Sequence, residues 1–303
     1  MSAIYVEPVS DAELLHMVVD LDREMFGNGV EIRQRTFALP GQLMQRFGYM
    51  SYICSGPDMP PLLARINGLL RQLYRPQDFA SGGHIGVFMY RDIFAKISVP
   101  WVFGTASFDP LKFVDLTELQ RQVLASEIVD LEFYLDQFND VADIQYGYLE
   151  VKMPFSEYEL LMRFAGLAKL QLHAASAILT GGYDFRGASQ SALLATELIL
   201  KAAAAGQGLS EKEIKVRFGH DLLKLTNFVG QCWAGFDADR VEGVISRQPA
   251  YVPNRYASEQ PSRTEVGHLV MGAQYIVSEI IRQISDRRFR DGMTLGFHRR
   301  YPA

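Results

Sequence analysis

Residues 184–205 read DFRGASQSALLATELILKAAAA, and residues 155–179 read FSEYELLMRFAGLAKLQLHAASAIL. Both stretches are rich in alanine, the residue with the highest helix propensity, and neither contains proline. The pair Gly181-Gly182 stands between them, where glycine commonly ends a helix. Small side chains let two helices approach closely. The two stretches therefore predict an antiparallel helical hairpin at the centre of the second half of the chain.

A serine followed three residues later by glutamate marks the start of several further helices. In such a capping box the hydroxyl accepts from one free amide while the carboxylate accepts from another. The second half contains three of them: Ser156/Glu159, Ser210/Glu213 and Ser262/Glu265. Shorter helices are predicted at 221–232 and 237–247, and a long last one at 264–285. Residues 153–303 are therefore predicted to form an all-α helical bundle.

The first half has a mixed pattern. A capping box at Ser10/Glu13 opens one helix, and Pro61 suits the first turn of another. Short apolar and alternating runs predict strands. The predicted elements that follow are strands at 87–90 and 94–99, a long helix at 117–138 and one more strand at 144–148. Residues 1–152 thus predict an α+β domain, and the chain as a whole is predicted to be mainly α.

Charge is spread unevenly along the chain. Residues 1–152 carry 12 Lys and Arg and 20 Asp and Glu, a net charge of −8, whereas residues 153–303 carry a net charge of +3. This change agrees with a domain boundary near residue 153, between an α+β domain at 1–152 and the helical bundle at 153–303.

Composition excludes several classes of protein. Apolar residues make up 48 % of the chain, which excludes intrinsic disorder, and two cysteines are too few for a disulfide framework. The N-terminus lacks the basic and apolar regions of a signal peptide, and no apolar run is long enough to span a bilayer. We therefore expect a soluble cytoplasmic protein that is not associated with a membrane. No Cys/His spacing indicates a metal site, and no motif indicates a cofactor.

Several short motifs occur in a characteristic order in the second half. Tyr183 follows a glycine turn and precedes the helix with Ala195-Thr196-Glu197-Leu198; after it come Gly219-His220-Asp221, then Arg255-Tyr256, then the final amphipathic helix. This succession, over about residues 155–286, resembles the HEPN superfamily of helical domains. The resemblance implies a helical bundle that forms a homodimer and binds a nucleotide, RNA or a protein partner, in bacterial defence or stress response. Residues 1–152 carry no family resemblance.

The resemblance also indicates candidate site residues. It implies ligand-binding roles for Arg255, Tyr256, Lys201 and His220. Each has a structural alternative. Lys201 and His220 can hold the bundle together with Glu197, and Arg255 can cap a helix or form a salt bridge.

Catalytic HEPN proteins are metal-independent ribonucleases that use an Arg-x4–6-His motif. Such cleavage needs a base and a cation that stabilises the developing charge on phosphorus. One literal match occurs, between Arg263 and His268. About one match is expected by chance from the Arg and His content. The alternative is that Arg255 occupies the place of the family's arginine, with no histidine close behind it, and that His268 belongs to the core or to an interface.

Two clusters of charged residues have a structural interpretation as well as a functional one. The six arginines between 282 and 300 outnumber two aspartates, which indicates either contact with RNA phosphates or a frayed terminus. The acidic residues Asp136, Asp140 and Asp143 lack the spacing of a metal-binding loop, which favours a solvated helix end.

The sequence leads to three hypotheses about function. The favoured one is a non-catalytic HEPN-like module that binds a nucleotide, RNA or a protein and is fused to an α+β domain. The alternatives are a metal-independent endoribonuclease using Arg263 and His268, and a homodimeric assembly protein without a small-molecule ligand.

Overall fold

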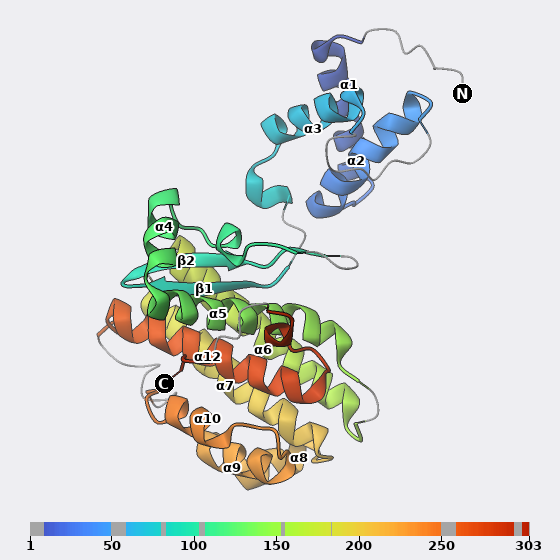
Figure 1. Cartoon of the computed structure of the whole chain (residues 1–303). Coiled ribbons are helices and arrows are strands. Elements are labelled where there is room, and N and C mark those ends of the chain that lie inside the picture. The colour runs from blue at the N-terminus through green and yellow to red at the C-terminus, as the bar shows by residue number, and fades with distance from the viewer. Residues whose placement is uncertain are drawn as a thin grey trace. The chain divides into compact units, whose positions relative to one another are not determined.

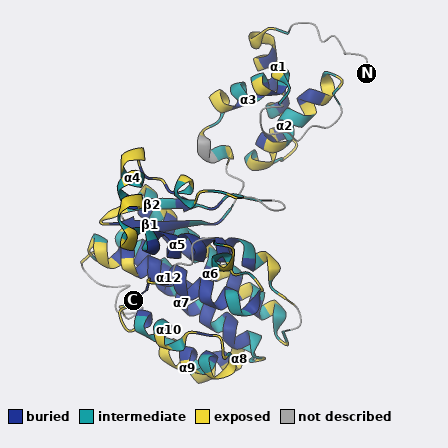
Figure 2. Ribbon diagram, viewed as in Figure 1, coloured by how far each residue is buried: buried dark blue, intermediate teal, exposed yellow. Residues whose placement is uncertain are grey.

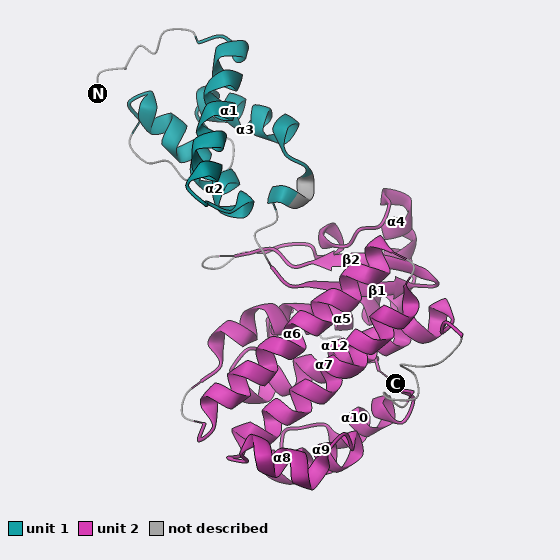
Figure 3. Cartoon of the chain, turned by 180° about the vertical axis from the view of Figure 1, so that it is seen from behind, with its two compact units in different colours: residues 1–82 teal, residues 83–303 magenta. Residues whose placement is uncertain are grey.

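The computed structural model of the chain describes residues 9–49, 59–79, 83–102, 107–152, 155–182, 184–249, 259–293 and 299–302. The chain divides into two compact units, Met1–Gly82 and Gly83–Ala303 (Figure 3). The described residues are mainly helical, with one small two-stranded antiparallel sheet (Figure 1). The boundary predicted near residue 153 is not confirmed, because residues 83–152 belong to the same compact unit as the second half.

The first unit packs three helices around a small core. They are α1 (Asp11–Gly27), α2 (Ile32–Arg46) and α3 (Pro61–Leu73), followed by a 3-10 turn, η1 (Pro76–Phe79). The predicted Ser10/Glu13 capping box is present at the start of α1. The three helices bury an apolar stripe each, and the core consists chiefly of Leu14, Val18, Leu21, Leu39, Leu43, Ile66 and Leu70.

The second unit begins with a hairpin and two helices. Strand β1 (Ile85–Tyr90) pairs with β2 (Ile93–Ser98), as the sequence predicts. A 3-10 turn, η2 (Pro110–Phe113), leads to α4 (Glu118–Ser126), α5 (Ile128–Gly147) and η3 (Tyr148–Glu150). Figure 1 shows the hairpin next to α5, and β1 also contacts α6 and α12, which come later in the chain.

In the rest of the second unit, the regular elements among the described residues are all helices. The long helices are α6 (Tyr158–Gly181), α7 (Phe185–Gly206) and α12 (Arg263–Ile284). Between and after them lie α8 (Glu211–Phe218), α9 (Leu222–Cys232), α10 (Ala238–Ile245) and the 3-10 turn η4 (Phe289–Gly292). Figure 2 shows that much of α7 and α12 is buried, whereas α8 and α9 expose one side to solvent.

Two predictions about α5 are wrong. Residues 144–148 were predicted as a strand, but α5 continues to Gly147, and the helix predicted at 117–138 is interrupted at Glu127, which has extended backbone. Polar groups near the end of α5 bond to the residues that follow β2. Tyr146 donates to the carbonyl of Pro100 at 2.6 Å, and Gln145 donates to that of Val99 at 3.3 Å. Tertiary contacts therefore bury both polar and apolar positions of this helix.

The capping boxes are partly confirmed. Those at Ser210/Glu213 and Ser262/Glu265 form as predicted. The one predicted at Ser156/Glu159 is wrong, because α6 begins at Tyr158 and its N-cap is Glu157 instead of Ser156, with no side-chain capping bond.

The alanine-rich hairpin is confirmed. Helices α6 and α7 pack against each other, and most of their alanines are fully buried, among them Ala168, Ala175, Ala192, Ala195 and Ala203. Close packing leaves no room for a larger side chain at these positions.

We expect Ala195→Leu in α7 to destabilise the second unit by about 1–3 kcal/mol, because added methylenes in a packed core force neighbouring side chains apart. Ala177→Leu is the matched control, since Ala177 is exposed on α6, and its effect should stay within about 0.5 kcal/mol. Both tryptophans, Trp101 and Trp233, lie in the second unit, so their fluorescence during urea unfolding reports on that unit alone. If the two variants unfold at the same urea concentration, the prediction is contradicted.

Candidate functional site

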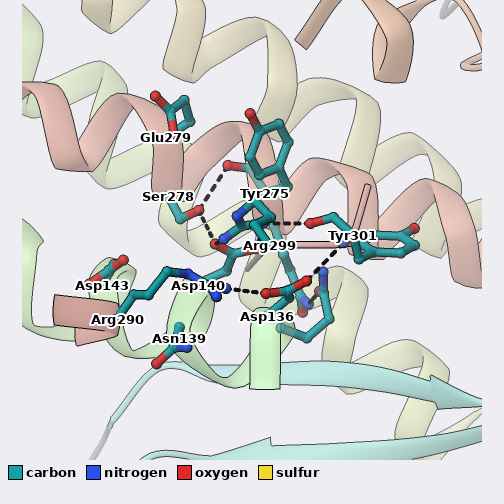
Figure 4. A network of polar contacts seen from close by, with 12 residues as sticks. Asp136, Asn139, Asp140, Asp143, Tyr275, Ser278, Glu279, Arg290, Arg299 and Tyr301 are labelled. Carbon is teal, nitrogen blue, oxygen red and sulfur yellow. Dashed lines mark hydrogen bonds and ion pairs between the residues drawn. The ribbon is translucent and has the colours of Figure 1, made fainter. Parts of the chain in front are cut away.

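A buried group of charged side chains ties α5 to α12 and to the end of the chain (Figure 4). We call it the ionic cluster; it comprises Asp136, Asp140, Asp143, Ser278, Glu279, Arg282, Arg290 and Arg299. Helix α5 supplies the three aspartates at spacings of four and three residues, which place them on one face. Their side chains are no more than 1 % exposed. The prediction of a solvated helix end is therefore wrong.

Asp140 is the centre of the ionic cluster. It accepts from Ser278 at 2.8 Å and from Arg282 at 3.0 Å, and it forms an ion pair with Arg299. Burial by itself raises the pKa of Asp140, but the guanidinium groups of Arg299 and Arg282 outweigh it and hold the pKa below its usual value. Asp140 is therefore ionised at neutral pH.

Arg282 completes the cluster on α12. Its Nη1 donates to Asp143 at 2.9 Å and its Nη2 donates to Glu279 at 2.8 Å. Burial raises the pKa of Asp143 to about 6, in spite of the charge on Arg282 and a bond from the amide of Phe289. Each member of this group bonds to at least one other member, so its evident role is to join three segments far apart in the sequence.

Five of the six arginines between 282 and 300 pair with carboxylates, Arg282 among them. Arg290 pairs with Asp136, Arg299 pairs with Asp140, and Arg300 pairs with Glu132. Arg287 pairs with Glu150. The alternative of a frayed terminus is therefore wrong for these residues, and most of the excess positive charge is neutralised by α5 and η3 instead of facing solvent.

A cavity of about 660 Å³ lies beside this C-terminal segment, since Tyr301 and Pro302 belong to its lining. Its wall is built from α5, α7, the end of α10, α12 and the residues that flank 250–258 on both sides. The polar lining includes Arg247, Gln248, Gln260, Glu265, His268 and Tyr301; the apolar lining includes Phe133, Val244, Pro261, Leu269 and Pro302. A partly apolar cavity of this size with a few convergent polar groups is typical of small-molecule sites.

His268 is accessible from the cavity. Its ring lies parallel to that of Tyr301, at 13° and with 6.1 Å between centroids, and its Nδ1 lies 3.3 Å from the Tyr301 hydroxyl. Burial, and secondly the charge on Arg247, lower the pKa of His268. Burial raises the pKa of Tyr301. At neutral pH the cavity therefore contains a neutral imidazole, a neutral phenol and a guanidinium.

Arg263, the other half of the predicted nuclease motif, lies elsewhere. Its guanidinium donates twice to the carbonyl of Asp92, at 2.8 and 3.1 Å, and lies 4.6 Å from the ring centre of Phe94. Positions five apart on a helix differ by about 140° around the axis, so Arg263 and His268 leave α12 in different directions. Arg263 holds the β-hairpin, and it does not line the cavity.

Lys201 and His220 come together, but outside the cavity wall. Lys201 Nζ lies 2.5 Å from Glu197, and His220 Nδ1 lies 3.0 Å from both oxygens of the same carboxylate. The Glu197 side chain is 7 % exposed while that of His220 is 69 % exposed. This arrangement fits the structural alternative, in which the three residues join α7 to the loop before α9. Arg255 and Tyr256 lie outside the described residues.

Sequence reasoning did not identify Arg247 or Gln248 as site residues. A helix was predicted at 237–247, but α10 ends at Ile245 and both residues follow it. Tyr301 lies outside every predicted helix and strand. The only signal was the match that contained His268, and its arginine was the wrong partner for the cavity.

Comparison with models of known protein families, with curated protein sequences and with solved structures finds no match to this chain. Within the described ranges, no three His, Cys, Asp or Glu side chains are close enough together to hold a metal ion. None of the helices in the described part of the chain has the length and apolar character needed to cross a membrane.

Proposed function

We propose that this protein is a non-catalytic binding module that takes a nucleotide, free or at the end of an RNA strand, in the cavity beside His268. The observation that supports this proposal is the joint presence of Arg247, His268 and two glutamine amides on a partly apolar wall around about 660 Å³. A nucleotide presents the matching chemistry, since its phosphate suits a guanidinium and its base suits an apolar wall with amide edges.

The HEPN-like relationship of the bundle belongs to the same proposal. It rests on the order of short motifs in residues 155–286, together with the close alanine-lined packing of α6 and α7. The homodimer and the role in bacterial defence or stress response, which the resemblance implies, stay predictions.

The direct test is calorimetric titration of the full chain with ATP, GTP, CTP, UTP and their monophosphates at pH 7.5. We expect Arg247→Ala to weaken binding about ten- to hundredfold, because a charge-assisted bond to phosphate is lost. Arg240→Ala is the matched control: Arg240 is close in sequence, pairs with Asp237 and does not line the cavity. The proposal would be refuted if the parent protein bound no nucleotide at millimolar concentration, or if both variants lost the same amount of affinity.

A second candidate function is metal-independent cleavage of RNA. One observation favours it: the cavity brings a neutral imidazole, His268, near the charge of Arg247, and these are the two groups that such cleavage needs. The arginine of this candidate is Arg247 and no longer Arg263. Incubation of RNA with the protein in EDTA tests it, with His268→Ala and Arg247→Ala as variants. Uncut RNA with the parent protein would dismiss it and leave the binding proposal in place.

A further inference from the structure

The backbone of Tyr301 is held by the ionic cluster. One oxygen of Asp136 accepts from the amides of Arg300 and Tyr301, each at 2.8 Å. Arg299 donates to the carbonyl of Tyr301 at 2.7 Å, and Phe133 packs edge-on against its ring at 5.8 Å. Tyr301 is only 8 % exposed. Its hydroxyl is therefore held at one place beside His268.

The Tyr301 hydroxyl lies 3.3 Å from two atoms of His268, the backbone carbonyl oxygen and Nδ1. A carbonyl oxygen can only accept, and a hydroxyl has a single proton to donate. When the hydroxyl donates to the carbonyl, its oxygen can still accept, so Nδ1 must be the donor. Both contacts are satisfied together only if the neutral imidazole carries its proton on Nδ1.

The other ring nitrogen is then an acceptor. Among the described residues, Nε2 of His268 has no hydrogen-bond partner, and the ring lines the cavity. The lining of the cavity also contains donor groups of other kinds, the guanidinium of Arg247 and the amide groups of Gln248 and Gln260. A bare imidazole nitrogen adds a neutral acceptor to this wall, beside the charged acceptors Glu259 and Glu265.

We propose that Tyr301 is a positioning residue that holds His268 as the Nδ1–H tautomer, so that Nε2 accepts a hydrogen bond from a hydroxyl or amino group of the bound ligand. The part that concerns the ligand rests on the proposed function. The tautomer itself does not, because it follows from contacts within the protein. The charged groups that line the cavity around this imidazole are Arg247, Glu259 and Glu265.

The tautomer is tested by long-range ¹H–¹⁵N correlation of the ¹⁵N-labelled full chain at pH 8, with the His268 signals assigned from His268→Gln. We expect a protonated Nδ1 and a bare Nε2 in the parent protein. In Tyr301→Phe, which keeps the ring but lacks the hydroxyl, the signals should move toward the Nε2–H tautomer that free histidine prefers. Tyr148→Phe is the control and should leave them unchanged. A parent protein with Nε2–H, or no change in Tyr301→Phe, would overturn the proposal.

The consequence for the ligand is tested separately by calorimetry with the nucleotide that binds the parent protein best. Tyr301→Phe should bind it about fivefold more weakly, the equivalent of one ordinary hydrogen bond. Binding should also weaken as the pH falls through the pKa of His268, because a protonated Nε2 becomes a donor. Equal affinity in the parent and in Tyr301→Phe would overturn this inference alone. If no nucleotide binds, the proposed function fails while the NMR result still decides the tautomer.

Discussion

Asp140→Ala is expected to destabilise the second compact unit by about 3–5 kcal/mol, the usual effect of breaking a buried ion pair by removing one partner. Asp140 has no exposed surface, and its carboxylate neutralises Arg282 and Arg299 while it accepts from Ser278. Without it, two largely buried guanidinium groups share fewer carboxylates, and the serine hydroxyl loses an acceptor. The measurement is urea unfolding followed by tryptophan fluorescence, which reports on this unit.

Asp286→Ala is the matched control for this prediction. Asp286 also pairs with a cation, Lys152, but the two side chains are 76 % and 57 % exposed. Exposed pairs contribute about 0–1 kcal/mol, so the control should unfold close to the parent protein. If Asp140→Ala unfolds at the same urea concentration as Asp286→Ala, the ionic cluster does not hold the unit together.

Gln274→Leu is expected to destabilise the same unit by about 2–4 kcal/mol, since each buried polar group left without a partner costs about 1–3 kcal/mol. Gln274, on α12, is fully buried and its amide bonds to both backbone groups of Val87: it accepts from the amide at 2.7 Å and donates to the carbonyl at 2.9 Å. The side-chain amide thus takes the place of a third strand along the outer edge of β1. Leucine has a similar volume but can satisfy neither group.

Gln122→Leu provides the control for Gln274→Leu. Gln122 lies on the exposed face of α4 and, among the residues that the structure describes, its side chain bonds to Glu118 alone, within the same helix. Its replacement should change stability by no more than about 0.5 kcal/mol. Hydrogen exchange adds a local readout, because the Val87 amide should lose protection in Gln274→Leu. Retention of that protection would show that the hairpin edge is closed by something other than Gln274.

The ionic cluster also explains how part of the cavity is built. It fixes residues 299–301 against α5, and Tyr301 belongs to the cavity wall. Asp140→Ala should therefore weaken nucleotide binding through misplacement of Tyr301 as well as through lower stability. Binding is accordingly compared at temperatures at which both proteins are folded.

The predictions made from helix-forming patterns agree best with the structure. The alanine-rich stretches of α6 and α7, the glycines between them and two of the three predicted capping boxes in the second half appear as predicted. The hairpin of β1 and β2 was predicted as well. These features depend on residues close together in the chain, so local propensity and capping determine them.

The predictions failed where distant segments supply the partners. The aspartates of α5 looked like a solvated surface because their arginines lie about 140 residues later. The end of α5 looked like a strand, but α12 and the hairpin region pack on different sides of this helix and bury polar as well as apolar positions. Arg263 looked like the partner of His268 because the two are close in sequence, whereas Arg247, from another helix end, shares the cavity with it.

By itself, then, the sequence determined that this chain is mainly helical, where most of its long helices begin and end, and that α6 and α7 pack closely. Only the tertiary structure decided which charges are buried, where the compact units divide and which side chains meet around the cavity. The physical reason is range: capping and helix propensity act within a few residues, whereas ion pairing in a desolvated interior depends on segments that folding brings together from far apart in the chain.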